Sequence, residues 1–268
     1  MCPSDSPDAG SDAMDGGSDG DGSDGSGPPT VLCHNGSCLP LPPTIRANLV
    51  LLLWPSNLPS IGSPVSVWAD QSGQGNDAHA LYPSALPHVI PDGVKLDPTQ
   101  LGSGFVVANS PSLDFGSGDF AIIAVAGLSS SATRVSLFQK SDGVRENSRQ
   151  ISIDWALSSS DMGRPQGTVN DTVVVTDRVV PQPSVGAYAL QRASNRIELH
   201  LNGSVLGGAD LPQGISTTNA ANVYVGVTNL LGSPADSIEA VIAIRGPIGA
   251  SDLNDLESFL RTLFATPP

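Results

Sequence analysis

The stretch over residues 68–78 constrains the fold more than any other part of the sequence. It reads Trp-Ala-Asp-Gln-Ser-Gly-Gln-Gly-Asn-Asp-Ala and follows a short apolar segment. Gly73 and Gly75 have no Cβ and can adopt positive φ, so the backbone can reverse direction within a few residues. Asp70 and Asn76 carry short side chains that can hydrogen-bond to the backbone of such a turn. The stretch therefore predicts a tight, self-bonded turn beside a buried tryptophan.

Short apolar segments separated by Gly, Pro and Asn-Gly turns occupy most of the chain after residue 45. This pattern, with 29 Gly and 23 Pro in 268 residues, is typical of a protein made of many short strands. The predicted strands are 49–54, 65–68, 94–96, 105–107, 118–126, 135–140, 150–157, 188–192, 196–201, 205–206, 223–227 and 237–244. The first of them, Leu49–Trp54, is apolar throughout, which indicates burial on both faces.

One helix is predicted at the end of the chain. Ser251 is a suitable N-cap, and Leu253, Leu256, Leu260 and Leu263 recur at helical spacing. We expect this helix to pack on the sheets as a lid.

Three segments resemble the laminin-G-like modules of the concanavalin A-like lectin/glucanase superfamily. Residues 68–78 match the W-x-D-x-S-G-x-G-N-x-A signature of that family, 118–125 its G-D-F-x-I-x-A-V strand, and 196–203 its R-I-x-L-x-L-N-G segment. The resemblance covers about residues 45–268. It implies an all-β fold, an antiparallel two-sheet jelly-roll sandwich with a short C-terminal helix.

The charge of the chain excludes some partners. The formal net charge is −14, and seven Asp lie before residue 30 without any Lys or Arg. The remainder still has 19 acidic against 12 basic residues. Both parts would be repelled by phosphate backbones and anionic lipids, so we expect no nucleic-acid partner.

The N-terminal segment differs in composition from the rest. Residues 3–27 contain seven Asp, seven Gly and six Ser, and cannot bury enough apolar surface to fold. We expect residues 1–44 to be a disordered tether followed by a Pro-rich linker, and residues 45–268 to be the folded domain.

Cys2, at the head of this tail, resembles the lipid-carrying cysteine of bacterial lipoproteins. The resemblance implies lipidation of Cys2 and an extracytoplasmic protein, anchored at the outer membrane or secreted, whose membrane contact is through the lipid alone. An unmodified cysteine is the alternative. The longest apolar run, Leu49–Trp54, is far shorter than the ~20 residues of a membrane-spanning helix.

Cys33 and Cys38 enclose a short loop with an Asn-Gly turn, which favours a small disulfide over free thiols. Zinc is disfavoured, because only His34 could join them and a structural zinc site needs four ligands. A disulfide would place the protein outside the cytosol.

Catalytic machinery is not visible in the sequence. Glucanases of the superfamily carry an E-x-D-x-E strand, and retaining hydrolysis needs two carboxyl groups about 5 Å apart. Here the corresponding strand, residues 150–155, holds only Asp154, and Glu198 and Glu239 each stand alone. A G-x-S-x-G nucleophile elbow is absent from the sequence. We expect no enzymatic activity.

Calcium is the one cofactor that the resemblance suggests. Laminin-G-like modules bind glycans or proteins, sometimes through a calcium ion at the rim. Asp70, Asn76 and Asp77 offer the oxygen ligands that this ion prefers. The alternative is that Asp70 and Asn76 only hold the turn.

A sugar-binding surface needs an exposed aromatic ring with polar groups around it. The three tryptophans lie in apolar strand contexts and are predicted to be core residues: Trp54, Trp68 and Trp155. The best candidate surface cluster is Tyr188 and Tyr224 with Glu198 and His200. Glu198 and His200 point to the same side of the strand predicted over residues 196–201. The sequence favours a recognition or adhesion module that binds a glycan or a surface protein; a purely structural domain and a glucanase-type enzyme stay as alternatives.

Overall fold

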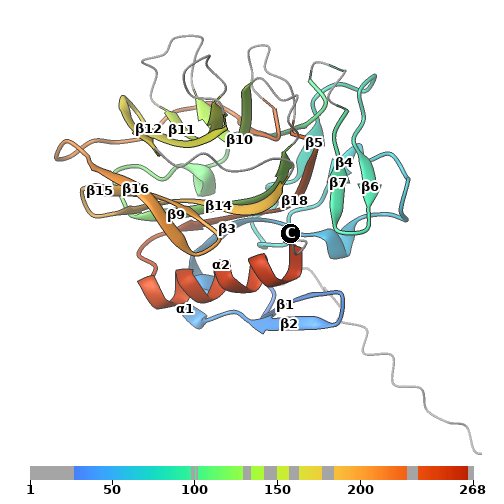
Figure 1. Ribbon diagram of the computed structural model, residues 1–268, viewed down its shortest axis with the longest axis horizontal. Coiled ribbons are helices and arrows are strands. Elements are labelled where there is room, and N and C mark those ends of the chain that lie inside the picture. The colour runs from blue at the N-terminus through green and yellow to red at the C-terminus, as the bar shows by residue number, and fades with distance from the viewer. Residues whose placement is uncertain are drawn as a thin grey trace, which may run out of the picture.

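Two antiparallel sheets stacked face to face form the body of the protein, as the computed structural model shows (Figure 1). The structure describes residues 27–97, 100, 102–128, 134–141, 150–156, 163–176, 184–227 and 235–264. Every strand pairing within these residues is antiparallel. The all-β two-sheet sandwich predicted from the sequence is confirmed.

We call the two large sheets sheet A and sheet B. Sheet A has the strand order β16-β15-β14-β9-β18-β7-β6, and β3 pairs with the second half of β18. Sheet B has the order β13-β12-β11-β10-β17-β8-β5-β4. The strands of sheet A are β3 (Leu49–Leu53), β6 (His88–Ile90), β7 (Gly93–Lys95), β9 (Phe120–Leu128), β14 (Ser184–Ala193), β15 (Arg196–Leu201), β16 (Ser204–Asp210) and β18 (Ser237–Arg245). Those of sheet B are β4 (Val67–Trp68), β5 (Ala78–Ala80), β8 (Phe105–Val107), β10 (Arg134–Ser141), β11 (Gln150–Ala156), β12 (Arg164–Val169), β13 (Thr172–Val175) and β17 (Val223–Val225).

The remaining elements are short, apart from the last helix. They are β1 (Val31–His34), β2 (Ser37–Pro40), α1 (Pro43–Asn48), the 3₁₀ turns η1 (Pro55–Asn57) and η2 (Pro111–Leu113), and α2 (Ala250–Phe264).

The main core lies between the sheets. Alternate residues along each strand face inward, so one face of each sheet contributes its apolar side chains. Trp68 and Trp155 are fully buried there, and Trp155 packs edge-on against Tyr188 with ring centroids 6.0 Å apart. The predicted core positions of all three tryptophans are confirmed, because Trp54 is also buried.

A second core covers the outer face of sheet A. It consists of apolar residues from the middle strands of that sheet, from α1 and α2, and from the β1–β2 hairpin. Leu253, Leu256 and Leu260 of α2 are buried on this face, where Ala187 and Ala189 of β14 leave room for the helix. The predicted packing of the C-terminal helix on the sandwich is confirmed. This second core also explains why strands β3 and β9 are apolar on both faces.

The β1–β2 hairpin shows that the folded part begins earlier than predicted. A disulfide joins Cys33 to Cys38 across the hairpin. The His34 ring stacks on Phe264 at a centroid distance of 4.9 Å, and Leu32 is buried in the second core. The prediction of a disordered tether and linker up to residue 44 is therefore wrong for the part from Gly27 onward, because this part has apolar residues to bury.

The structure bears differently on the predicted lipid attachment at Cys2 and on the predicted lack of a membrane-spanning helix. Cys2 and the Asp-rich tail over residues 1–26 lie outside the described residues. Among the helices of the described chain, none has the length and apolar character to span a membrane.

Candidate functional site

The four residues predicted to form one ligand-binding cluster do not come together. Tyr188 lies on β14, where its neighbours Ala187 and Ala189 face the second core, so Tyr188 itself points between the sheets. It is 1% exposed. Its assignment as a surface residue is therefore wrong, because the pairing of β14 in sheet A turns the tyrosine inward.

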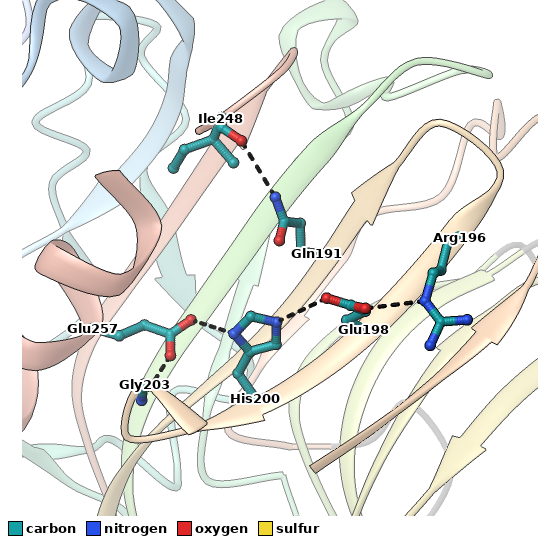
Figure 2. Close-up of polar contacts among 7 residues, drawn as sticks. All are labelled: Gln191, Arg196, Glu198, His200, Gly203, Ile248 and Glu257. Atoms are coloured by element: carbon teal, nitrogen blue, oxygen red, sulfur yellow. Dashed lines mark hydrogen bonds and ion pairs between the residues drawn. The ribbon is translucent and has the colours of Figure 1, made fainter. Parts of the chain in front are cut away.

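Glu198 and His200 lie on the outer face of sheet A, as the alternation along β15 predicted. That face is covered by α2, and His200 is only 4% exposed (Figure 2). The assignment of His200 to a surface cluster is wrong, because α2, which begins fifty residues later in the chain, packs over it.

A buried glutamate of α2 completes this polar cluster. Glu257 Oε1 lies 3.1 Å from His200 Nδ1, and Glu257 Oε2 accepts a hydrogen bond of 2.8 Å from the backbone N–H of Gly203. Glu198 forms an ion pair with Arg196 at 3.0 Å. Sequence reasoning missed Glu257. The available signal was a glutamate four residues after Leu253 and three before Leu260, within the apolar stripe of the helix.

Tyr224 belongs to the other sheet, and here the outward orientation is correct. Its neighbours Val223 and Val225 face the core, and Tyr224 is half-buried on the outer face of sheet B. The helices and the hairpin of the described chain all lie on the side of sheet A (Figure 1). The outer face of sheet B is therefore the candidate functional surface.

A row of residues in register crosses this face from one edge to the other. Tyr224 pairs with Gln139 on one side and with Val106 on the other, and Val106 pairs with His79. Neighbouring strands are ~4.8 Å apart, so these side chains adjoin one another. The complete row is Val67, His79, Val106, Tyr224, Gln139, Ser152, Thr168 and Val173. We call it the central row.

A buried carboxylate lies next to the central row. Asp154 of β11 faces outward, because its neighbours Ile153 and Trp155 face the core. It accepts hydrogen bonds from the hydroxyl of Ser152, at 2.6 Å, and from that of Ser136. Asp154 is paired in register with Gln166, which is half-buried on the same face.

A cationic group also lies on this face. Arg164 of β12 is two residues before Gln166 and therefore points to the same side. Its side chain is half-buried.

Among the described residues, the outer face of sheet B thus combines the rings of Tyr224 and His79, two glutamine amides and a guanidinium that are exposed or half-buried. The hydroxyls of Ser152 and Thr168 and the Asp154 carboxylate on the same face are buried.

The turn over residues 68–78 uses its polar groups internally. Asp70 Oδ1 accepts hydrogen bonds of 2.9 Å from the backbone N–H groups of Leu52 and Ser72. Asp70 Oδ2 accepts from the Ser72 hydroxyl at 2.7 Å and from the Asn76 N–H at 2.9 Å.

The other two predicted calcium ligands are engaged in the same way. Asp77 Oδ1 accepts a hydrogen bond of 2.8 Å from the Asp70 N–H, and Asn76 Oδ1 accepts one of 2.7 Å from the Ser110 hydroxyl. In the described part of the chain, no group of three or more His, Cys, Asp and Glu side chains could hold a metal ion. This geometry does not fit a calcium site, because side-chain oxygens of Asp70, Asn76 and Asp77 already accept hydrogen bonds from N–H and O–H groups. It agrees with the alternative that Asp70 and Asn76 hold the turn.

Glu239 is a separate buried carboxyl group in sheet A. Burial raises its pKa to about 8, and the hydroxyl of Ser237, which donates at 2.6 Å, offsets this only in part. Asp92 raises the pKa further through its negative charge. The three carboxylates considered for catalysis are therefore dispersed: Asp154 is on the outer face of sheet B, Glu198 on that of sheet A, and Glu239 beside β7 and β9.

Comparisons with known proteins give structural likenesses only. No family model matches the chain, and no curated protein sequence matches it. A Trypanosoma rangeli sialidase solved with 2,3-difluorosialic acid matches with a TM-score of 0.61 and 18% identity, over 84% of this chain and 34% of the sialidase. The chain therefore spans about a third of that protein.

Two binding domains share the fold as well. The binding domain of Paraclostridial Mosquitocidal Protein 1 matches with a TM-score of 0.53 and 12% identity, over 80% of this chain and 52% of that domain. The CBM40 of the Ruminococcus gnavus IT-sialidase, bound to α2,3-sialyllactose, matches with a TM-score of 0.51 and 17% identity, over 62% of this chain and 96% of the module. At these identities the likeness establishes the fold alone, and the chain shares the antiparallel β-sandwich of these proteins.

Proposed function

We propose that this chain is a non-catalytic carbohydrate-recognition module that binds glycan on the outer face of sheet B. The observation that carries the proposal is the central row, in which the half-buried Tyr224 stands between Val106 and Gln139. The face of a tyrosine ring stacks on the C–H groups of a pyranose, and the half-buried Gln139 beside Tyr224 carries an amide of the kind that bonds to sugar hydroxyls.

We propose an acidic sugar as the ligand class on the basis of the Arg164 guanidinium, although the Asp154 carboxylate on the same face and the formal net charge of −14 oppose an anion. Arg164 and Gln166 project from the same face as Tyr224, and a guanidinium binds a carboxylate through two parallel hydrogen bonds. Two of the structural neighbours were solved with sialic acid or sialyllactose. Sialylated glycans are therefore the first ligands to test.

The non-catalytic part of the proposal has support from the carboxylates. Asp154, Glu198 and Glu239 are separated by the thickness of the sandwich or by several strands, whereas the two-carboxylate mechanism of most glycoside hydrolases needs both carboxyl groups on one cleft. Asp154 is engaged by the hydroxyls of two serines.

The proposal places the protein outside the cytosol. The Cys33–Cys38 disulfide supports this location, because such bonds persist in oxidising compartments. We further propose that the chain is related to laminin-G-like modules and that a lipid on Cys2 attaches it to the membrane. A surface protein, in place of a glycan, is the other ligand that we propose.

Titration calorimetry with α2,3-sialyllactose and with lactose tests the proposal. We expect binding of the sialylated sugar, and at least about tenfold weaker binding by Tyr224→Ala, since a stacked aromatic commonly contributes that much. Tyr82→Ala is the matched control, because Tyr82 is 52% exposed and lies outside the strands of the central row.

Three outcomes would contradict, in turn, the assigned binding surface, glycan binding itself and the non-catalytic role. Equal affinity of wild type and Tyr224→Ala removes the assigned surface. If the protein binds no glycan on an array, the alternative of a purely structural domain is favoured over a carbohydrate-recognition module. Release of sialic acid from a fluorogenic sialoside removes the non-catalytic role.

A further inference from the structure

His79 is the one histidine whose ring has no polar contact with the described part of the chain. The other three, His34, His88 and His200, each have an oxygen atom of another residue within 3.4 Å of a ring nitrogen. His79 lies on β5, and its side chain is exposed on the outer face of sheet B. Both of its ring nitrogens are therefore available to a ligand.

The longest accessible part of the central row, to which His79 belongs, runs from β4 to β10. The five residues in this part are exposed or half-buried: Val67, His79, Val106, Tyr224 and Gln139. We call these five residues the open strip. The next two members of the row, Ser152 and Thr168, are buried. A ligand that lies along the row therefore has its widest contact at the open strip.

Two residues of the open strip are apolar although they face outward. Val67 is 43% exposed and Val106 is half-buried, whereas the solvent face of an antiparallel sheet normally carries polar residues. The imidazole of His79 stands between these two valines, and Tyr224 lies on the other side of Val106. Outward apolar groups combined with planar rings and unused polar atoms are the composition of a sugar-binding surface.

The spacing of the two rings fits one sugar ring. Cβ atoms of directly paired residues are about 5 Å apart, so the Cβ atoms of His79 and Tyr224, with Val106 between them, are about 10 Å apart. Side chains stand roughly perpendicular to a sheet. Van der Waals contact on both faces of a pyranose needs about 4 Å on each side, or about 8 Å in all. A pyranose between the two rings would therefore contact both and rest on the methyl groups of Val106.

The open strip contains no carboxylate, ammonium or guanidinium group. Arg164, the guanidinium proposed to bind an acidic sugar, lies three strands from Tyr224 and four residues along β12 from Thr168. The spacings of strands and residues place the Cα atoms of Arg164 and Tyr224 roughly 20 Å apart. One sugar ring therefore does not contact both the open strip and Arg164.

We propose that His79 and Tyr224 form the two walls of a subsite for one neutral pyranose, with Val106 as its floor, and that a hydrogen bond between a sugar hydroxyl and the imidazole of His79 selects that sugar. A hydroxyl both donates and accepts, so either kind of imidazole nitrogen serves. The inference rests on the proposed glycan binding and deepens it. In a sialylated oligosaccharide, the subsite takes a neutral sugar, and the acidic sugar lies elsewhere on the face.

NMR titration of the full chain with lactose, a neutral disaccharide, and with α2,3-sialyllactose tests the subsite directly. We expect the ring resonances of His79 and the methyl resonances of Val106 to shift with both sugars. The methyl resonances of Val205, an exposed valine on β16 of sheet A, are the internal control and should not shift.

Two substitutions of His79 separate the wall from the hydrogen bond. His79→Phe keeps a flat ring without nitrogen atoms and should weaken lactose binding about two- to tenfold, the equivalent of one neutral hydrogen bond. His79→Ala also removes the ring and should weaken binding further. His88→Ala is the matched control, because His88 is exposed on β6 of sheet A, and it should keep the wild-type affinity.

The outcomes distinguish the subsite from glycan binding as such. If sialyllactose binds and Tyr224→Ala weakens it, while His79→Ala binds both sugars like the wild type, the subsite is overturned and the proposed function stands. Sugar binding without a shift at Val106 overturns the subsite in the same way. If the wild type binds neither sugar, the subsite is overturned as well, and a glycan array decides separately on the proposed function.

Discussion

Asn76 donates a hydrogen bond of 2.6 Å from its side-chain amide to the backbone carbonyl of Val50, on the free edge of β3. The neighbouring groups of the same turn bond to Leu52, whose N–H donates to Asp70 Oδ1 and whose carbonyl accepts from the Gln71 N–H. The turn over residues 68–78 therefore takes the place of a further strand beside β3. An open strand edge would otherwise present unpaired backbone groups.

Replacing Asn76 tests this role. Asn76→Ala removes the donor to Val50 and leaves a buried carbonyl without its partner, so we expect the free energy of unfolding to fall by about 2–3 kcal/mol. Chemical denaturation measures the change. Asn254→Ala, at an exposed position of α2, is the control and should change stability by no more than about 0.5 kcal/mol. Similar small effects for both variants would contradict the assigned role.

Calcium should not stabilise the protein through this turn. The carboxylate of Asp70 already accepts four hydrogen bonds from backbone and hydroxyl donors, so an ion would have to displace them. We expect the thermal midpoint to be the same with excess calcium and with EDTA. An increase of several degrees with calcium that Asp70→Asn abolishes would show that the turn binds the ion.

Substitutions of Tyr188 and Tyr224, which the sequence predicts to share one cluster, should have opposite effects on stability and on glycan binding. Tyr188→Ala removes a fully buried ring from between the sheets and should cost about 3–5 kcal/mol of stability. Tyr224→Ala should leave stability within about 1 kcal/mol and reduce glycan binding. Denaturation curves and calorimetry on both variants make the comparison. A large loss of stability in Tyr224→Ala would show that its ring is part of the core.

Glu239 should make the fold less stable at higher pH. Its pKa in the folded protein is raised from 4.5 to about 8, so the folded state holds a proton that the unfolded chain releases. The free energy of unfolding is then highest below about pH 4.5, falls as pH rises, and reaches its lower level above about pH 8.

Glu239→Gln separates this contribution from others. The amide cannot ionise, so the variant should lose less stability than wild type between about pH 5 and 9. Denaturant titrations at several pH values provide the comparison, with Asp255→Asn on the exposed side of α2 as the control. Parallel curves for wild type and Glu239→Gln would contradict the assignment.

Local patterns predicted individual strands and turns, and the resemblance to laminin-G-like modules implied their arrangement in two sheets. Uniformly apolar residues over Leu49–Leu53 predicted a strand buried on both faces, and all five are buried. The strands predicted at 188–192 and 196–201 pair with each other as parts of β14 and β15, and Ser194 in the turn between them adopts a φ of 58°. Such features depend on neighbours within a few residues, which a single sequence displays directly.

The candidate site depended on relationships that a single sequence does not display. Whether Tyr188 faces the core or the solvent depends on the register of β14 against β9, and a shift of one residue reverses it. Whether His200 is exposed depends on where α2 packs, and its partner Glu257 follows 57 positions later. The central row joins strands that are distant in the chain, so only the folded sheet brings Tyr224 next to Gln139.

The β1–β2 hairpin and α2 share one side of the molecule, on the outer face of sheet A (Figure 1). A support that holds the protein by either of these two elements would leave the opposite side, sheet B, directed away from it. Tyr224 and its neighbours would then be the part of the sandwich that meets large ligands arriving from the surrounding medium, whatever the nature of the attachment.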